Sequence, residues 1–290
     1  WHIIKKHEFH QEFKISASKL INFLYQIESA YNDNPYHNKY HAADVVNNVY
    51  WFLTQCSSLK KHITSFDIFM TVMAAAFHDV DHDAKTNAFH ARIKSNLALR
   101  YNDNSILENH HVSYAFKLVV SNKDLYDWIG DLNDDSLIET ARKYMIRLIL
   151  GTDMIQHKKH GQHLENLKAK MKDTLSEDDK LDLLSIILHA CDIANAAKPR
   201  TLCMEWARRC VGEFRLQGDE EKQRFGKESQ PLFSRATPLE QSQPGWINYV
   251  MKPYYKPLND LLNGDIQMLV DYLDSNAKQW TEYKEYDNQQ

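Results

Sequence analysis

A strongly apolar segment, residues 66–77, runs directly into His78-Asp79-Val80-Asp81-His82. Nearly every position in the segment is apolar, which predicts a helix that is buried on all sides. Imidazole and carboxylate groups that leave such a helix together are costly to bury without partners. These groups therefore need either a metal ion or a hydrogen-bond network. The alternative interpretation is an ordinary polar helix end whose groups are all hydrogen-bonded.

Helical periodicity recurs along the rest of the chain, without a convincing run of alternating β-branched residues. Ser136 and Ser176 resemble helix N-caps, and loops are expected at 130–135 and 225–244. Only 8 of the 290 residues are glycine, which argues against a β-fold with many tight turns. We expect further helices at 16–30, 41–53, 87–99, 109–120, 136–149, 181–190, 201–217, 246–262 (bent or broken by Pro253 and Pro257) and 266–279.

These features predict an all-α fold, a compact multi-helix single domain over residues 1–290, to which the polar clusters described below add a buried two-metal site. The absence of an initiator methionine suggests a domain excised from a longer chain. With 35 Lys and Arg against 39 Asp and Glu, no basic excess is available to bind nucleic acid. No apolar stretch approaches the roughly 20 residues of a membrane helix, and no signal peptide is apparent.

The 4 cysteines form no C-x-x-C pair. Cys203 and Cys210 are two helical turns apart, and we expect them to lie in the core rather than in a disulfide. Cysteines used in this way are typical of a reducing compartment. We therefore expect an intracellular, cytoplasmic protein.

Further polar clusters accompany the first. His37 and His41 are four residues apart, so they share one face if their segment is helical. Asp192 follows the apolar run 183–188. Each cluster alone is also compatible with an ordinary helix end. Together, two histidines and two aspartates from separate helices would make a mixed nitrogen and oxygen site suited to Zn²⁺ or another transition ion. A bridging Asp79 with bound waters would suit a harder second ion, Mg²⁺ or Mn²⁺.

Two such ions about 3.5–4 Å apart clamp a phosphate and lower the pKa of a shared water. The clusters therefore predict phosphoester hydrolysis. Residues 78–89 (HDVDHDAKTNAF) also resemble the signature of class I 3′,5′-cyclic-nucleotide phosphodiesterases. Further segments resemble that family in the same order, namely 36–45 (YHNKYHAADV), 107–111 (LENHH), 152–154 (TDM), 189–199 (HACDIANAAKP), 217–219 (QGD) and 241–246 (QSQPGW).

The resemblance implies an all-α catalytic domain that hydrolyses 3′,5′-cyclic nucleotides, with cyclic AMP as the first candidate and cyclic GMP as the second, to 5′-monophosphates. It assigns His41, His78, Asp79 and Asp192 to a tighter ion, Zn²⁺, with Asp79 also binding Mg²⁺ or Mn²⁺. His37 would protonate the departing O3′, and Glu108 would accept a hydrogen bond from His37. The residues implied around the metal-bound waters are His82, His111 and Thr152.

The resemblance also implies a base pocket in which Gln243 and Asn195 meet the purine edge. Phe214 and Trp246 would sandwich the ring, and the neighbouring residues would be Tyr36, Met154 and Cys210. The alternative interpretation is that Phe214 and Cys210 are ordinary core residues that share one face of a helix. Three departures affect this pocket: Trp246 replaces the family's usual Phe, Cys210 a larger apolar residue, and Ala196-Ala197 a Pro-Thr pair.

Two other functions compete with this one. A phosphohydrolase of the HD-domain kind shares the His, His-Asp, Asp pattern but lacks the segments around Glu108 and Gln243. An inactive homologue kept as a regulatory module would not need the complete set of ligands. The residues leave the choice between cyclic AMP and cyclic GMP open, as they do regulatory domains or a homodimer as partners.

Overall fold

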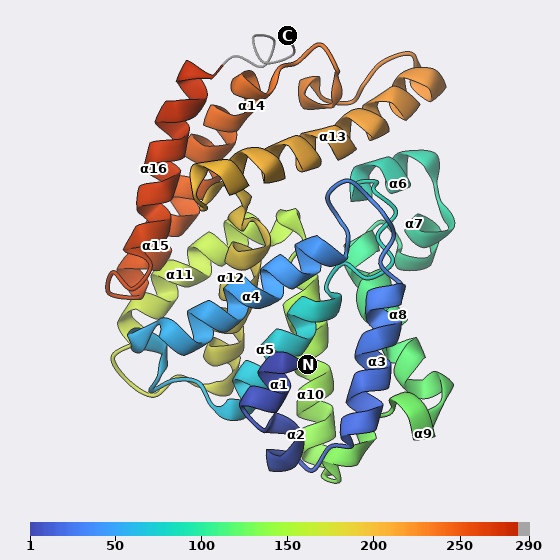
Figure 1. Ribbon diagram of the computed structural model, residues 1–290, viewed down its shortest axis with the longest axis vertical. Helices are drawn as coiled ribbons and strands as arrows, with labels where there is room; N and C mark the ends of the chain where they lie inside the picture. The colour runs from blue at the N-terminus through green and yellow to red at the C-terminus, as the bar shows by residue number, and fades with distance from the viewer. Residues whose placement is uncertain (284–290) are drawn as a thin grey trace.

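The computed structural model describes residues 1–283, and its regular elements within that range are all helical (Figure 1). This confirms the all-α prediction. The α-helices are α1 (His2–Lys6), α2 (Phe9–Glu12), α3 (Ala17–Ser29), α4 (Lys39–Gln55), α5 (Ser65–Phe77), α6 (Asn87–Ile93), α7 (Asn96–Tyr101), α8 (Ile106–Ser121), α9 (Lys123–Tyr126), α10 (Asp135–Leu150), α11 (His157–Lys170), α12 (Glu177–Asp192), α13 (Arg200–Phe225), α14 (Leu239–Trp246), α15 (Lys252–Leu261) and α16 (Gln267–Glu282).

Helix α5 lies at the centre of the molecule, as its apolar sequence predicts. It starts at a capping box in which the Thr64 hydroxyl accepts from the Asp67 amide and the Asp67 carboxylate accepts from the Thr64 amide. It packs against α3, α4, α8, α10 and α12. Because it ends at Phe77, it delivers His78 and Asp79 into the middle of the helical bundle.

The chain turns sharply after α5. Asp81 and Ala84 have φ values of 61° and 62°, in the left-handed region that is unfavourable for a residue with a Cβ. Within this turn the Ala84 amide donates to His82 Nδ1 at 3.0 Å. The strained backbone therefore orients the His82 ring beside the end of α5.

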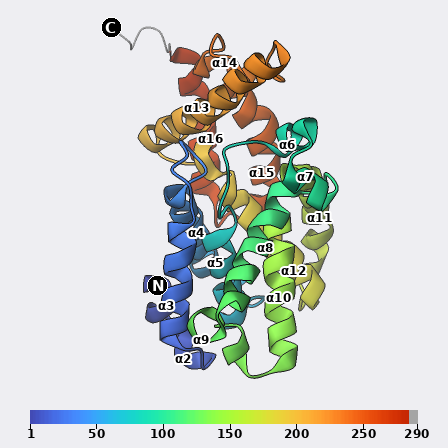
Figure 2. The same ribbon diagram turned by 90° about the vertical axis from the view of Figure 1, so that its right-hand side faces the viewer.

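Helix α13 crosses one end of the bundle, as both views show (Figures 1 and 2). Its inner face carries Glu213, Gln217 and Glu221, spaced by four residues and each at most 2 % exposed. Gln217 Oε1 accepts from the Thr86 amide at 2.8 Å, and Glu221 Oε1 accepts from the Ser229 hydroxyl at 3.0 Å. These side chains tie to α13 both the start of α6 and the chain that follows α13.

Gly218 allows one of these segments to approach closely. A Cβ at this position would lie 2.1 Å from the backbone oxygen of Phe233, in the 3₁₀ turn Pro231–Phe233. Any side chain at 218 would therefore push this turn, which lines the large cavity described below, away from α13.

The expected single helix at 87–99 is wrong, because α6 and α7 are separated at Lys94, where φ is 52°. The expected N-cap at Ser136 is also wrong, because the Asp134 carboxylate caps α10 by accepting from the Leu137 amide. Ser176 does cap α12. Helix α11 was not anticipated, because it is mostly polar and buries few apolar side chains.

The region 225–262 also differs from expectation. Helix α14 begins at Leu239, inside the expected loop, and a π-helical turn, Ile247–Met251, joins it to α15. Pro253 lies in the first turn of α15, where its missing N–H costs little, and Pro257 lies within that helix without ending it.

The cysteines are free, as expected. Cys203 is buried, whereas Cys210 is half-buried. Within residues 1–283, no helix has both the length and the apolarity needed to cross a lipid bilayer.

Candidate active site

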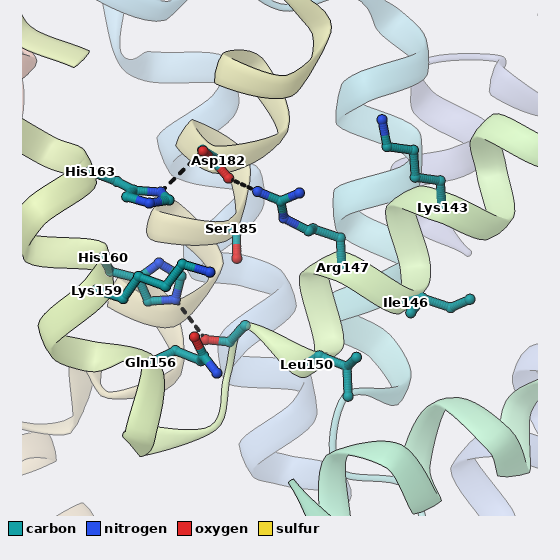
Figure 3. Close-up of a pocket in the computed structure, with 11 residues that line it drawn as sticks. Lys143, Ile146, Arg147, Leu150, Gln156, Lys159, His160, His163, Asp182 and Ser185 are labelled. Carbon is teal, nitrogen blue, oxygen red and sulfur yellow. Dashed lines mark hydrogen bonds and ion pairs between the residues drawn. The ribbon is translucent and has the colours of Figure 1, made fainter. Parts of the chain in front are cut away.

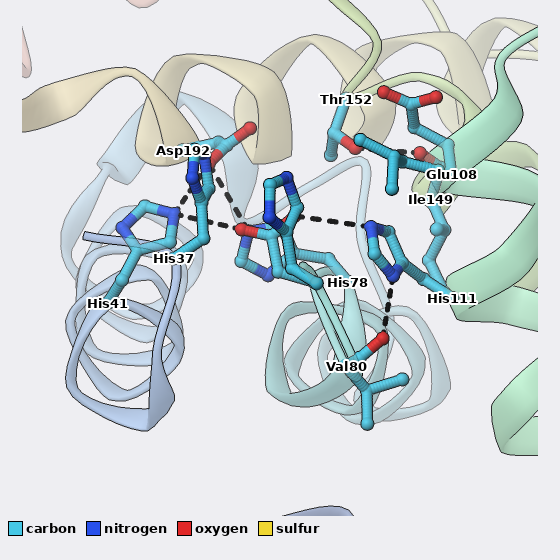
Figure 4. Close-up of polar contacts among 12 residues, drawn as sticks. His37, His41, His78, Val80, Glu108, His111, Ile149, Thr152 and Asp192 are labelled. Atoms are coloured by element: carbon cyan, nitrogen blue, oxygen red, sulfur yellow. Dashed lines mark hydrogen bonds and ion pairs between the residues drawn. The ribbon is translucent and has the colours of Figure 1, made fainter. Parts of the chain in front are cut away.

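Four predicted metal ligands converge from three helices (Figure 4). His41 lies on α4, Asp192 ends α12, and His78 and Asp79 follow α5. Asp192 Oδ1 lies 2.9 Å from His41 Nε2 and 3.2 Å from His78 Nε2. Asp79 Oδ2 lies 3.4 Å and 3.1 Å from the same two nitrogens. Residues far apart in the sequence thus present their ligand atoms to one point.

The His78 ring has a defined tautomer. Its Nδ1–H donates to the Ala75 carbonyl at 2.9 Å, so the Nε2 lone pair faces the two carboxylates. Burial disfavours the imidazolium, but Asp79 and Asp192 raise the pKa of His78 well above its usual value. The four groups therefore need positive charge between them, which either a proton or a metal ion can supply.

The residues fit a divalent cation. For metal–ligand bonds of about 2.0–2.1 Å, tetrahedral geometry places ligand atoms about 3.3 Å apart, close to the separations above. Moreover, Asp79 Oδ2 is buried and accepts no hydrogen bond from residues 1–283. A buried carboxylate oxygen without a donor is expensive unless a cation meets it. His41, His78, Asp79 and Asp192 would hold the ion.

His37 does not pair with Glu108, which corrects the expected role of Glu108. The carboxylate against His37 Nδ1 is instead that of Glu213 on α13, whose other oxygen accepts from the Tyr36 and His37 amides at 2.9 Å and 3.0 Å. Glu108 accepts from Asn87 Nδ2 at 2.9 Å, and the same Asn87 side chain accepts from the Leu107 amide. Asn87 thus holds the start of α8 against the start of α6, and it donates to Oε2 of the Glu108 carboxylate.

The two carboxylates have different effects on acidity. Burial opposes the charged imidazolium, but Glu213 outweighs it and raises the pKa of His37 to about 9. Burial, reinforced by the Asp153 carboxylate, raises the pKa of Glu108 itself to about 8. The raised pKa favours the protonated form of the half-buried His37, which is the form required of a general acid.

The three residues expected around the metal-bound waters line one large cavity, which is described below. His111 Nδ1–H donates to the Val80 carbonyl at 2.6 Å, so its Nε2 lone pair faces Asp79 Oδ1, 3.8 Å away. The Thr152 hydroxyl donates to the Ile149 carbonyl at 2.8 Å. His82 stacks on His37 with ring centroids 4.0 Å apart.

His37, His82 and Glu213 also lie close enough together to suggest a metal group. The His82 tautomer argues against it. His82 Nδ1 accepts from the Ala84 amide, so in the neutral ring Nε2 carries the proton and has no lone pair to donate. Burial, reinforced by charged His37, keeps the pKa of His82 well below its usual value, so this ring is neutral.

A cavity of about 570 Å³ opens above the metal ligands. Its walls bring together every residue expected to bind substrate, namely Tyr36, Met154, Asn195, Cys210, Phe214, Gln243 and Trp246. Phe214 stacks on Phe233, with ring centroids 5.1 Å apart. Gln243 is 6 % exposed and its Oε1 is buried without a donor from residues 1–283. The lining thus combines aromatic rings and amides with carboxylates and imidazoles.

A second cavity, of about 400 Å³, lies between α10, α11 and α12 (Figure 3). Its polar groups are largely matched to each other. Asp182 accepts from Arg147 and lies 3.0 Å from His163 Nδ1, and His160 Nε2 donates to the Gly151 carbonyl at 2.8 Å. It contains none of the predicted metal ligands, so the first cavity is the candidate active site.

Glu213 is the functional residue that sequence reasoning missed. It directly precedes Phe214, which was singled out, and it begins the Glu213, Gln217, Glu221 series at four-residue spacing. Polar residues at that spacing, on a helix whose apolar positions share the same side, could have indicated a buried polar face. The partner of Glu213 lies 176 residues away, and spacing alone does not identify it.

Comparison with known proteins gives a consistent result. A sequence model of the 3′5′-cyclic nucleotide phosphodiesterase family matches residues 36–273. The human dual specificity calcium/calmodulin-dependent 3′,5′-cyclic nucleotide phosphodiesterase 1B is 35 % identical over 279 residues, which is 95 % of this chain and 50 % of that protein. The 3′,5′-cyclic-AMP phosphodiesterase 4C of Rattus norvegicus is 33 % identical over 288 residues, 96 % of this chain and 52 % of that protein. The chain thus spans about half the length of these curated relatives.

Solved structures agree in fold. The phosphodiesterase domain of the RhoPDE fusion protein from the choanoflagellate Salpingoeca rosetta superimposes with a TM-score of 0.89 at 30 % identity, covering 100 % of this chain and 90 % of that one. The structure of LmjPDEB1 in complex with IBMX gives a TM-score of 0.88 at 26 % identity, covering 97 % of this chain and 84 % of that one.

Proposed function

The chain belongs to the 3′5′-cyclic nucleotide phosphodiesterase family, a family that uses divalent metal ions, and on this premise we propose that it hydrolyses 3′,5′-cyclic nucleotides to 5′-monophosphates. The observation that carries the proposal is the four-ligand cluster at a cavity that is also lined by His37, whose Nδ1 lies against the Glu213 carboxylate. Cyclic AMP is the proposed substrate, with cyclic GMP as a second.

The proposed metals are Zn²⁺ at the site of His41, His78, Asp79 and Asp192, and Mg²⁺ or Mn²⁺ beyond Asp79. The mixed nitrogen and oxygen donors support the first assignment. The second site would take only Asp79 from the protein and fill its coordination with water, as hard cations prefer. When bound, two divalent ions would neutralise the phosphate and supply a nucleophilic water at neutral pH.

The protein groups have separate proposed tasks. His37, held by Glu213, donates its proton to O3′ as the P–O3′ bond breaks. Asp192 orients the attacking water. His82 offers an Nε2–H and His111 an Nε2 lone pair toward the cavity, so that one can donate to water and the other can accept. The Thr152 side chain would lie against the same waters.

Phe214 and Trp246 are proposed to hold the purine ring, with Tyr36, Met154 and Cys210 beside it. Gln243 and Asn195 would meet the base edge. Gln243 Nε2 donates to the Ser242 hydroxyl at 3.2 Å, but a hydroxyl can also donate. Gln243 can therefore turn its amide to suit either adenine or guanine, which supports two substrates.

We propose an intracellular, cytoplasmic location, which the free cysteines support. Regulatory domains or a homodimer are proposed as partners.

The direct test measures kcat/KM for cyclic AMP, cyclic GMP and a 2′,3′-cyclic nucleotide, and identifies the products by chromatography. We expect turnover of 3′,5′-cyclic substrates, with 5′-monophosphate as the product. Binding without turnover in a preparation loaded with Zn²⁺ and Mg²⁺ would instead identify an inactive regulatory homologue. Hydrolysis confined to 5′-monophosphates would point to a phosphohydrolase.

Trp246→Ala is expected to raise KM by about 5- to 150-fold with a much smaller change in kcat. Stacking of a base on an aromatic side chain is worth roughly 1–3 kcal/mol, and each 1.4 kcal/mol is about tenfold. The indole lines the cavity but is not one of the metal ligands, so the chemical step is affected less. Steady-state kinetics and thermal unfolding on the same sample provide the measurement.

The matched control is Tyr249→Ala, which removes an aromatic ring that is 83 % exposed and outside the cavity. We expect its KM to remain unchanged. A fall in melting temperature for Trp246→Ala with an unchanged KM would mean that the indole only anchors its helix.

A further inference from the structure

Trp246 makes a contact that a phenylalanine could not make. Its indole Nε1–H donates to Asn195 Oδ1 at 3.2 Å. Trp246 ends α14, and Asn195 lies in the 3₁₀ turn Ala194–Ala196, directly after the helix that supplies Asp192. Both side chains line the substrate cavity, and Asn195 is only 8 % exposed. The hydrogen bond therefore joins an aromatic wall of the cavity to a buried amide.

This contact fixes the orientation of the Asn195 amide. An indole nitrogen is only a donor, so the asparagine must present its oxygen to Trp246. The Asn195 NH₂ group then points away from the indole, and no hydrogen bond ties it to another residue in the described range 1–283. An asparagine without such a partner could rotate by 180° and exchange its donor and acceptor positions. Asn195 cannot do so without losing the indole bond.

Gln243, on the same helix as Trp246, is not fixed in this way. Its recorded partner is the Ser242 hydroxyl, which can either donate or accept, and its Oε1 is buried without a donor. Two of the amides that line the cavity thus differ, because that of Gln243 is reversible whereas that of Asn195 is fixed. A bound base can therefore select the orientation of the Gln243 amide, but it meets the Asn195 amide in a single orientation.

We propose that Trp246 is a specificity-determining residue, which reduces the preference of this site for adenine over guanine by holding the Asn195 amide in one orientation. The inference rests on the proposed function and concerns its substrate choice. Asparagine pairs best with adenine when its oxygen accepts from N6 while its NH₂ group donates to N7. At Asn195 the oxygen is shared with the indole, so adenine gains less from it. Guanine presents O6 and N7, both acceptors, and a fixed NH₂ group serves either.

The test is Trp246→Phe, which keeps an aromatic face and removes the N–H. We expect the ratio of kcat/KM for cyclic AMP to that for cyclic GMP to rise by about 2- to 12-fold, corresponding to one net hydrogen bond of about 0.5–1.5 kcal/mol at tenfold per 1.4 kcal/mol. An unchanged or lower ratio overturns the proposal. General damage to the fold lowers both rates together, so a rise in the ratio reports a change in the choice of base.

A double-mutant cycle separates the hydrogen bond from the shape of the ring. In an Asn195→Ala background, Trp246→Phe is expected to leave the ratio unchanged, because there is no amide to release. A shift of equal size in both backgrounds overturns the proposal, since ring shape alone would then set the choice. If Asn195→Ala does not fold, Asn195→Leu, which has nearly the same shape, takes its place.

Failure of the proposed function gives a different result. In that case the wild-type protein hydrolyses neither cyclic nucleotide. Failure of the present inference appears as hydrolysis of both nucleotides with a ratio that Trp246→Phe does not move.

Discussion

Asp79→Ala is expected to remove bound divalent metal and to reduce hydrolysis to the background of the assay. The Asp79 carboxylate faces both ligand imidazoles, at 3.1 Å from His78 Nε2 and 3.4 Å from His41 Nε2. It is also the one predicted ligand shared by both ions. Metal analysis after dialysis, together with activity over a range of added Zn²⁺ and Mg²⁺, measures the effect. Chelation of the wild-type protein should give the same loss.

The variant should also unfold at a lower temperature. Removal of one carboxylate leaves buried imidazoles that have lost part of their compensating charge, and metal bound only by the folded state no longer contributes to stability. Asp192→Ala is expected to weaken mainly the tighter site, because Asp192 Oδ1 lies near His41 and His78. Differential scanning calorimetry with and without metal resolves the two contributions.

Asp83→Asn is the matched control for this experiment. Asp83 belongs to the same segment, but its carboxylate lies 3.1 Å from His90 and its side chain is 47 % exposed. We expect this variant to keep its metal. Full activity of Asp79→Ala, or of wild-type protein from which the metal has been stripped, would contradict the metal-dependent mechanism as a whole.

The helices that carry the metal ligands are the best predicted part of the fold. Helix α5 was recognisable because an uninterrupted apolar run has few other stable placements, and its end coincides with His78. The ligand clusters can also be predicted from the sequence, because polar groups that directly follow a buried helix need a partner. The meeting of α4, α5 and α12 at one point, however, is a tertiary property. The residue types make a shared metal site chemically reasonable, and the resemblance to a family adds the assignment of each ligand.

The errors have identifiable physical causes. The break at Lys94 requires a left-handed backbone, which the lysine at this position does not predict. Helix α11 is stabilised by a few buried side chains, such as Leu164 and Leu167, rather than by a strong apolar stripe. The expected pairing of Glu108 with His37 comes from the family resemblance alone, whereas the long helix α13 brings Glu213 to that position. Such long-range pairing is decided by packing, which local spacing does not encode.

His37→Asn is expected to lower kcat by about 10²- to 10⁴-fold while metal content is retained. His37 is not one of the four converging ligands, and its Nδ1 is held by Glu213. The discriminating substrate is a cyclic nucleotide in which sulfur replaces O3′, because a thiolate leaves without needing a proton. The sulfur substrate should lose far less than the natural one. Equal losses on both substrates would show that His37 is not the proton donor.

The pH dependence tests the same assignment through Glu213. His37 must be protonated to act, so activity falls as pH rises through the pKa of His37. Because the Glu213 carboxylate raises that pKa, Glu213→Gln should lower it and shift the alkaline limb of the kcat profile to lower pH. The matched control is Glu108→Gln, which changes a carboxylate in the same cavity that does not contact His37. We expect that variant to leave the alkaline limb in place. A shift in Glu108→Gln without one in Glu213→Gln would reverse the two roles.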